Sequence, residues 1–561
     1  MKKSIIISGL IASIILAPSC AGLLDITPPN NITSEQVEDL LANGNDSQKA
    51  IVVSGVMNPM VKFFNFSEAM GTGNIASTGA ADVVHYSDQG VEWLCNLYCN
   101  DIAIGWDKSS NQLAGRDLYY YEAKMFTSNV MNNASHWFHK AYAINQANVV
   151  LDMFTEEGAE SSATVADGRA RALLVRAYAY MCLMQDYQDA YLRGGKDKLG
   201  ISLYDTYSPG QSPKPRATAE ETYAFIKKDI SDAIKFLTAA KIGYTGGRDN
   251  DEDIDLGLAY FLQARVSLWT GDYATCITAC NNIINSGKYS LIKPEFYGGH
   301  NTGASWAPAD IVILPETNAF VSLAVNPECI LGYKKTSSFI GSGAHKALSN
   351  IFGTYSQSHT PARIDDRLYN KINDNDCRKD CFYPNVIGDY DFPTGTSYLP
   401  DYCNVKFAQT VGLNDAGTGN DGDKSHTSLS DFCRFRLAEV YLMKAEAENA
   451  SNNTGAAKTT LNTLLAARTK TGAATLTCDN YGGPSNFTEF IQLQWRIEMW
   501  GENGMEFYNN KRWGVDVNRT GSTVHPYVGN GVLLSGSKMT YEIPEREQQD
   551  NPKCEPNGGI D

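Results

Sequence analysis

Apolar positions recur with the spacing of a helix over several separate stretches of this chain. Apolar residues at every third or fourth position form one hydrophobic stripe along a helix. At Thr218 two acidic residues follow closely, as they do at a helix N-terminus, and prolines interrupt the chain just before it. The pattern predicts helices over residues 34 to about 60, 136–154, 168–187, 218–240 and 487–502.

Two further stretches predict helical hairpins. The first pairs residues 256–270 with 274–286 through the turn Gly271-Asp272-Tyr273. The second pairs residues 431–449 with 456–468. Small side chains on both helices and a short turn between them are typical of tetratricopeptide units. We therefore expect a mainly α fold with a tetratricopeptide-like helical-repeat scaffold.

Two long stretches lack this spacing and are rich in glycine and aromatic residues, at 63–135 and 291–430. We interpret them as two large loop-rich insertions in the scaffold, and long ordered loops often carry function. The predicted organisation is a lipoprotein signal peptide at 1–19, a lipid anchor and tether at 20–33, an N-terminal region with helical repeats at 34–290, the insertion at 291–430, and a C-terminal region with a helical repeat and tail at 431–561.

The N-terminus has the layout of a bacterial lipoprotein signal. Lys2 and Lys3 precede an apolar run over 5–16, and small residues lead into Cys20. The run is shorter than the roughly 20 residues that span a bilayer, so we expect cleavage before Cys20 and anchoring by lipid on that cysteine. An ordinary secretory signal with cleavage near Ala21 is the alternative.

Charge narrows the classes of partner. The chain has 47 basic and 63 acidic side chains, for a net charge of -16. Nucleic acid is bound by clusters of lysine and arginine, so we expect no nucleic-acid partner. No apolar stretch after residue 16 is long enough for a transmembrane helix, so the rest of the chain is expected to be soluble and exported.

Neither cysteine spacing nor acidic runs predict a metal site. Three cysteine pairs have i,i+4 spacing, but no histidine or second pair lies at zinc-ligand spacing, and buried free thiols are the favoured interpretation. The acidic run at 249–255 lacks the glycine of a calcium-binding loop. A solvent-exposed segment that leads into the next helix explains it better. The cysteine pairs are Cys95/Cys99, Cys276/Cys280 and Cys377/Cys381.

Aromatic residues are the best candidates for ligand contact. They make up 11% of the chain, and flat rings suit stacking against sugars. Five of the 8 tryptophans fall in or beside helical patterns and are assigned to the core. The lead candidates for ring stacking lie in the irregular stretches and are Trp93, Trp106 and Trp306; weaker candidates are Tyr98, Tyr119, Tyr297 and Phe339. For each of these rings, packing of its own loop is the competing interpretation.

An ordered set of motifs resembles the SusD/RagB family of outer-membrane nutrient-binding lipoproteins. The strongest match is the helix Arg436-Leu437-Ala438-Glu439-Val440-Tyr441-Leu442-Met443-Lys444-Ala445-Glu446-Ala447. A near-terminal segment, Ile543-Pro544-Glu545-Arg546-Glu547 through Asn551-Pro552, is similar to the family's IPxxExxxNP signature. Further matches are Cys20 with Leu24 to Pro28, Trp137 to Asn148, Arg169 to Tyr187, Tyr273 to Tyr289, and Asp365-Asp366-Arg367. Glu506 and Asn509 depart from the family, which commonly has arginine and aspartate there.

The resemblance implies a SusD-like fold and a non-catalytic lipoprotein on the outer membrane, facing the cell exterior. Such a protein binds oligosaccharides and delivers them to a SusC-like TonB-dependent transporter. A peptide-binding, RagB-like importer subunit is the alternative within the family. We see no H-E-x-x-H motif or nucleophile elbow, and expect no cofactor. Two carboxylates suffice for glycoside hydrolysis, so a surface hydrolase stays open as a further alternative, as does a pure protein-interaction scaffold.

Overall fold

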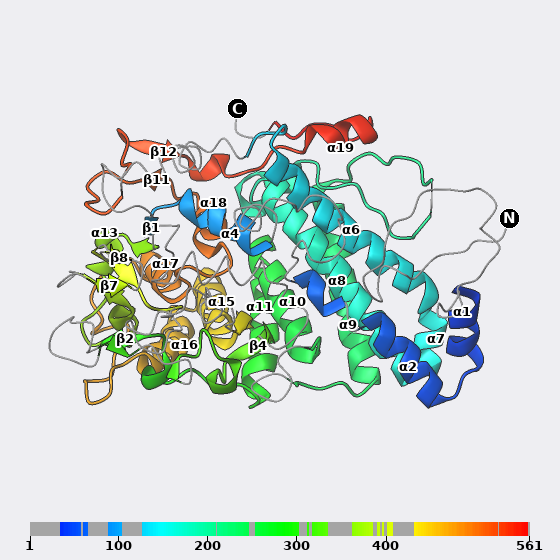
Figure 1. Cartoon of the computed structure of the whole chain (residues 1–561), viewed down its shortest axis with the longest axis horizontal. Coiled ribbons are helices and arrows are strands. Elements are labelled where there is room, and N and C mark those ends of the chain that lie inside the picture. The colour runs from blue at the N-terminus through cyan, green and yellow to red at the C-terminus, as the bar shows by residue number, and fades with distance from the viewer. Residues whose placement is uncertain are drawn as a thin grey trace.

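Helices dominate the structure and form the long body of the molecule (Figure 1). The computed structural model describes residues 34–558 except 58–59, 65–87, 104–125, 209, 246–252, 302–310, 313–316, 335–361, 385–389, 393–394, 398–400, 408–430 and 526. The predicted mainly α fold is confirmed. Within the described part, no helix combines the length and apolarity needed to cross a bilayer.

A long buried helix, α8 (Ala163–Tyr187), organises the N-terminal half. It packs against α2 (Asp46–Met57), α6 (Met131–Met153), α7 (Glu156–Ser161) and α9 (Ala219–Ala239). Small residues allow this close packing: a Cβ on Gly168 would lie 2.5 Å from the ring of Phe154. At the start of α9, Thr218 and Glu221 form a reciprocal capping box, which agrees with the helix start predicted at Thr218.

Both predicted hairpins are present. The first consists of α10 (Leu256–Thr270) and α11 (Tyr273–Asn285), and the second of α15 (Leu437–Ala450) and α16 (Thr454–Ala467). Gly271 ends α10 with φ of +76°, a conformation that favours glycine, and Asp272 caps α11. Helix α11 packs against α15, so the two hairpins stack into one scaffold.

Three helix predictions need correction. The stretch 34–60 breaks at Gly44 into α1 (Ser34–Asn43) and α2, followed by the 3-10 helix η2 (Met60–Phe64). The helix predicted at 487–502 ends earlier than expected and forms α17 (Phe487–Glu498). Gly501, Asn503 and Gly504 have positive φ, which interrupts the helix before α18 (Met505–Trp513) begins. Residues 432–436 form strand β10 (Phe432–Arg436) paired with β4 (Cys329–Tyr333), where a helix was predicted.

The described part of the 63–135 insertion also contains regular structure that its composition concealed. It holds α4 (Asp88–Leu97), β1 (Ile102–Ala103) and the start of α6. Strand β1 belongs to a four-stranded sheet of order β1-β5-β9-β6, with β5 (Arg363–Ile364), β9 (Cys403–Asn404) and β6 (Phe382–Tyr383). The remaining short elements include β2 (His300–Asn301), β3 (Ile311–Val312), β7 (Tyr390–Phe392), β8 (Gly395–Ser397), α13 (Asp366–Tyr369), β11 (Val517–Asn518) and β12 (Val532–Leu534).

The C-terminal tail returns to the N-terminal helices, where α19 (Glu545–Asp550) lies near one end of α6 (Figure 1). Trp137 donates its ring N–H to Glu547 at 3.1 Å, and Asn551 donates to the carbonyl of Lys214 at 2.9 Å. The near-terminal signature residues therefore fasten the tail to the scaffold.

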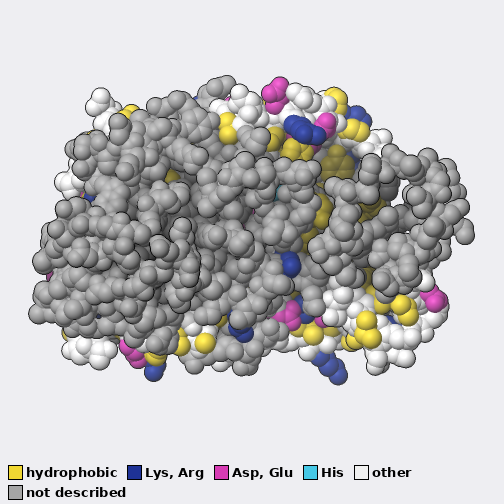
Figure 2. Space-filling model, viewed as in Figure 1, with side chains coloured by type: hydrophobic (Ala, Val, Ile, Leu, Met, Phe, Trp, Pro, Cys, Tyr) yellow, Lys and Arg dark blue, Asp and Glu magenta, His cyan; other side chains and the backbone are white. Residues whose placement is uncertain are grey.

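Hydrophobic side chains remain visible on this face of the molecule. In Figure 2 those of the described residues gather at the upper right, over α6 and α19, and at the lower right, over α1 and α2. Ile51 of α2 is 71% exposed.

A buried lysine joins α18 to α8. Lys511 is 2% exposed and donates to the carbonyl of Gln185 at 2.5 Å. Burial lowers the pKa of Lys511 to about 8, although the carboxylates of Asp186 and Asp189 raise it. The carboxylate of Asp186 forms hydrogen bonds with other groups, namely the ring of His136 at 2.6 Å and the hydroxyl of Tyr508 at 2.8 Å.

We predict that Lys511 makes stability depend on pH in the alkaline range. The pKa of Lys511 is about 8 in the folded protein and about 10.5 in the unfolded chain. Between these two pH values the unfolded chain binds more protons than the folded protein. The free energy of unfolding therefore increases as pH rises through this range. In urea titrations from pH 7 to 10.5, the stability of wild type relative to Lys511→Met should rise by about 3 kcal/mol. A difference that does not vary with pH contradicts this. Lys228→Met, at a side chain 72% exposed on α9, is the matched control.

Candidate functional site

The structure brings the two loop-rich insertions together at the four-stranded sheet. Strand β1, from the first insertion, pairs antiparallel with β5, from the second, with Ile102 opposite Ile364. The backbone N–H of Asp365 donates to the carbonyl of Asp101 at 3.0 Å and continues this contact. Stretches that are more than 250 positions apart in the sequence therefore meet along one sheet.

The hairpin of β2 and β3 forms a separate two-stranded sheet beside the four-stranded one. Its strands pair with His300 opposite Val312, and residues 302–310 connect them. Just before β2, the N–H of Gly299 donates to the carbonyl of Val405, next to β9, at 3.1 Å. Ala103, which directly precedes segment 104–125, is therefore in this sheet, and Gly299, just before β2, contacts the residue that follows β9.

Most of the predicted ligand-contacting residues lie outside the described part of the chain. This applies to Trp106, Tyr119, Trp306 and Phe339, and also to the predicted lipidation residue Cys20. The backbone of Trp93 is described and belongs to α4, but its side chain is not.

Two of the weaker candidates lie in the interior. Tyr98 is 2% exposed and packs on Phe126, with ring centroids 4.5 Å apart. Tyr297 is also 2% exposed, lies beneath the guanidinium of Arg468 at 4.7 Å, and donates to the carbonyl of Glu498 at 3.3 Å. Their placement in irregular sequence suggested access to solvent, but both rings fill the core. We therefore leave them out of the proposed binding surface.

An arginine of β10 fixes α4 against the scaffold. Arg434 is 1% exposed, and its two terminal guanidinium nitrogens each donate to a carboxylate oxygen of Glu92 at 2.5 Å. It also donates to the hydroxyl of Tyr178 on α8 at 2.6 Å and to the carbonyl of Phe64 at 2.8 Å. One side chain therefore holds the first insertion to both β10 and α8.

Glu506, one of the departures from the family pattern, anchors the segment that leads into β1. Its two carboxylate oxygens accept the backbone N–H groups of Asn100 and Asp101 at 2.8 and 3.0 Å. Burial and the neighbouring Asp101 raise the pKa of Glu506 well above its ordinary value, although Arg496 lowers it. Sequence reasoning flagged this position only as a disturbed ion pair and missed its partners, because they are backbone groups about 400 positions away.

A buried ion cluster lies beneath the sheet and joins the second insertion to the C-terminal helices. Arg436, the first residue of the strongest family motif, bonds to Glu498 at 2.7 Å, to Glu502 at 2.7 Å and to Glu328 at 3.0 Å. Every member is at most 8% exposed. The cluster consists of Glu328, Asp376, Arg378, Lys406, Arg436, Arg468, Glu498 and Glu502.

Glu498 of α17 is the centre of this cluster. It accepts hydrogen bonds from Arg436, Arg468 and Arg378, the last at 3.0 Å. Burial alone raises the pKa of Glu498, but these three guanidinium groups lower it, and the net pKa lies well below the ordinary value. The carboxylate is therefore ionised at neutral pH and is shared by three of the four buried cations, which the other three carboxylates of the cluster help to balance.

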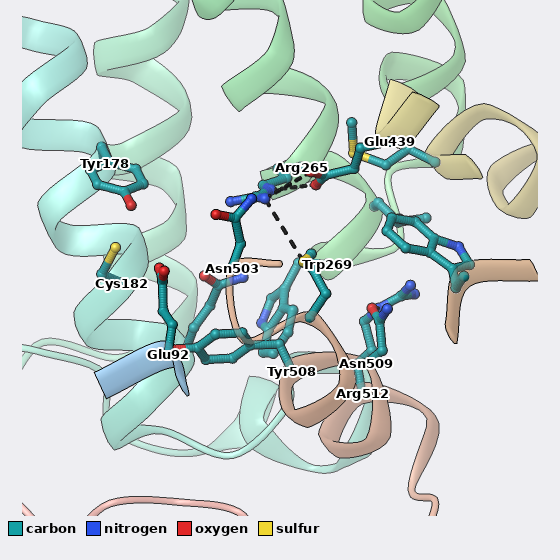
Figure 3. Close-up of a pocket in the computed structure, with 15 residues that line it drawn as sticks. Glu92, Tyr178, Cys182, Arg265, Trp269, Glu439, Asn503, Tyr508, Asn509 and Arg512 are labelled. Carbon is teal, nitrogen blue, oxygen red and sulfur yellow. Dashed lines mark hydrogen bonds and ion pairs between the residues drawn. The ribbon is translucent and has the colours of Figure 1, made fainter. Parts of the chain in front are cut away.

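A small cavity with both apolar and polar walls lies where α4, α8, α10, α15 and α18 meet (Figure 3). Arg265 and Glu439 point toward each other there and are joined by two hydrogen bonds of 2.6 and 3.0 Å. The cavity measures about 40 Å³, which holds water but no sugar ring. Its carboxylates, Glu92 and Glu439, are both paired with arginines. The geometry thus gives this cavity a structural role.

Residues that could hold a metal are engaged in other contacts. In the described ranges no group of histidine, cysteine, aspartate and glutamate side chains is arranged to bind a metal ion. From the acidic run at 249–255, Asp253 pairs with Arg171, and Asp255 caps α10 by accepting the N–H of Leu258 at 2.8 Å. The three i,i+4 cysteine pairs are buried free thiols, as expected. Burial raises the pKa of Cys99 and of other thiols among them, which disfavours the reactive thiolate.

Comparison with known proteins identifies relatives of both halves of the chain. Residues 362–556 match the SusD family model, and residues 60–244 match a family model described as "Starch-binding associating with outer membrane". The two matches together span well over half of the chain. No curated protein matches the sequence.

Solved structures share the fold over nearly the whole chain. A SusD-like carbohydrate binding protein from Bacteroides vulgatus is 19% identical with a TM-score of 0.63, covering 91% of this chain and 97% of that one. A SusD superfamily protein from Bacteroides thetaiotaomicron is 19% identical with a TM-score of 0.64, covering 91% and 99%. Another SusD superfamily protein from Bacteroides vulgatus is 16% identical with a TM-score of 0.65, covering 91% and 99%.

We predict that Glu498→Gln destabilises the protein strongly at neutral pH. The substitution leaves three buried guanidinium groups without their shared carboxylate, and loss of one partner in such a cluster typically costs about 3–5 kcal/mol. Urea unfolding at pH 7 measures this. Because the wild-type carboxylate stabilises the fold only when ionised, the difference should shrink as pH falls below the ordinary glutamate value of about 4.5. Glu489→Gln, on the exposed face of the same helix, should change stability by less than about 0.5 kcal/mol.

We also predict that Glu506→Ala destabilises the segment that precedes β1, at Asn100 and Asp101. The variant leaves two buried N–H groups without an acceptor, so amide exchange at Asn100 and Asp101 should accelerate at least about tenfold. Hydrogen-exchange mass spectrometry of peptides covering 97–103 measures this. Glu506→Gln keeps one acceptor oxygen and should give an intermediate rate. Unchanged exchange in the alanine variant would show that the carboxylate does not hold this segment.

Proposed function

Because this chain belongs to the SusD family, we propose that it is a non-catalytic protein of the outer membrane that binds oligosaccharides for nutrient uptake. The description of the family matched by residues 60–244 supports both glycan binding and the outer-membrane location. The fold shared with a carbohydrate binding protein from Bacteroides vulgatus agrees with this class of ligand. In this proposal, lipid on Cys20 anchors the protein, which faces the cell exterior.

The proposed binding surface is formed by Trp93, Trp106 and Trp306. The observation that carries it is the sheet that joins the two insertions. Trp106 follows Ala103 of β1 by three residues in the sequence. Trp306 falls between β2 and β3 in the sequence, and Trp93 belongs to α4, which precedes β1. Tyr119 and Phe339 are the remaining candidates in these segments.

Stacking explains why such a surface would prefer oligomers. Each ring that packs against a sugar face contributes about 0.5–1.5 kcal/mol beyond the area it buries. A single contact of this size binds weakly, so several rings in a row favour a chain of sugars over one unit. Captured oligosaccharides would then pass to a SusC-like TonB-dependent transporter, the proposed protein partner.

We predict that Trp93→Ala, Trp106→Ala and Trp306→Ala each weaken oligosaccharide binding by about twofold to tenfold, because each removes one stacking ring. Isothermal titration calorimetry with a panel of neutral oligosaccharides measures the change. Tyr297→Phe, which alters a ring in the core, is the matched control and should bind as wild type does.

Three further assays separate the alternatives: calorimetry with peptides, a reducing-end assay with polysaccharides, and a pull-down of the transporter. Binding of peptides but no glycan would replace the proposed ligand with the peptide class. Release of reducing ends from polysaccharides by the purified protein would show a hydrolase. Capture of a barrel transporter without binding of any small ligand would indicate a pure interaction scaffold.

A further inference from the structure

A hairpin in the C-terminal region carries exposed apolar side chains close to the sheet that joins the two insertions. Its strands are β11 and β12, and Figure 1 shows them above β1. Among the described residues, four large hydrophobic side chains are well exposed, and two of them belong to this hairpin. They are Tyr527, at 38%, and Val532, at 55%. We call residues 527–533 the hairpin tip.

The hairpin tip and its flanks carry no charged side chain. Residues 521–537 contain no aspartate, glutamate, lysine or arginine, although such residues make up 20% of the chain. Burial lowers the pKa of His525 well below its ordinary value, so this side chain is neutral. Arg367, which donates to backbone carbonyls at the base of the hairpin, is paired with Asp365 at 2.7 Å. The tip therefore offers apolar and neutral polar groups, among them the exposed Asn530, but no partner for an ionic ligand.

Buried hydrogen bonds attach the base of the hairpin to both insertions. The ring N–H of His525 donates to the carbonyl of Asn100 at 2.7 Å, and the backbone N–H of Asn518 donates to the side-chain oxygen of Asn100 at 2.9 Å. On the other side, Arg363 of β5 donates to the carbonyl of Val524 at 3.2 Å. The tip, which begins two residues after His525, is therefore held beside the sheet on which the proposed binding surface depends.

Two glycines shape the hairpin tip. Gly529 and Gly531 have φ of +61° and +101°, conformations that favour glycine. A Cβ on Gly529 would lie 2.3 Å from Cδ2 of Leu533 and 3.7 Å from Cε1 of Tyr527, so both side chains lie against this glycine. The tyrosine ring is thus positioned before a ligand binds, and a preformed site loses little entropy on binding.

The size of the exposed apolar surface favours a small ligand over a protein. A stable protein interface buries about 800 Å² on each partner. A whole aromatic side chain buries about 150–250 Å², so the partly exposed Tyr527 and Val532 supply only a small part of such an interface. One exposed ring is enough to stack against one sugar unit.

We propose that Tyr527 is a further stacking ring of the glycan site, and that the saccharide unit bound there is uncharged. The C–H face of the sugar lies against the ring, and the amide of Asn530 and the hydroxyl of Tyr527 are available to the sugar hydroxyl groups. The inference rests on the proposed glycan binding and extends it in two ways. It adds a residue from outside the two insertions, and it specifies a neutral glycan.

The test is isothermal titration calorimetry of the full chain with maltohexaose, xylohexaose and mannohexaose, and with hexagalacturonate as the charged counterpart. Tyr527→Ala should weaken binding of a neutral hexasaccharide by about twofold to tenfold, because it removes one ring. Tyr527→Phe keeps the ring and should bind within about twofold of wild type. The matched control, Tyr207→Ala, alters a partly exposed tyrosine next to α6 and should bind as wild type does. Thermal unfolding confirms that each variant is folded.

The outcomes separate this inference from the proposed function. If the tryptophan variants weaken binding and Tyr527→Ala does not, the Tyr527 proposal fails and the proposed function stands. If no glycan binds, both fail. Equal losses in Tyr527→Ala and Tyr527→Phe would contradict stacking, and tighter binding of hexagalacturonate than of every neutral hexasaccharide would overturn the uncharged ligand. Loss of transporter capture by Tyr527→Ala without loss of glycan binding would show a protein contact instead.

Discussion

The ion cluster around Arg436 and Glu498 is the constraint on which the rest of the structure depends. Its members come from the second insertion, from β10, from α16 to α17 and from the turn after α17. Charges removed from water are tolerated only when each has its partners in good geometry, and any missing partner leaves an expensive buried charge. The cluster therefore allows one arrangement of these segments and strongly penalises others.

The helical scaffold and the irregular insertions have different tasks in this arrangement. Helices α8, α10, α11 and α15 pack through small and apolar residues into a rigid body. Arginine and glutamate side chains then attach the insertions to that body, as Arg434 does for α4 and Glu506 for the entry to β1. Long loops can in this way carry a binding surface without contributing a core of their own.

Local sequence predicted the helices well and the junctions poorly. Both hairpins, α8 and the capping box of α9 follow from apolar spacing and capping residues alone. Strand β10 was predicted as part of a helix because its identity is set by pairing with β4, about 100 positions away. The interior positions of Tyr98 and Tyr297 depend on partners such as Arg468 that no local pattern reveals.

The attachment of the tail to α6 also has a consequence for biogenesis. Trp137 and Glu547 are 410 positions apart, and Glu92 and Arg434 are 342 apart. Contacts of such high sequence separation close large loops and make folding slow. The N-terminal helices must wait for nearly the entire polypeptide to be synthesised before their last partners exist.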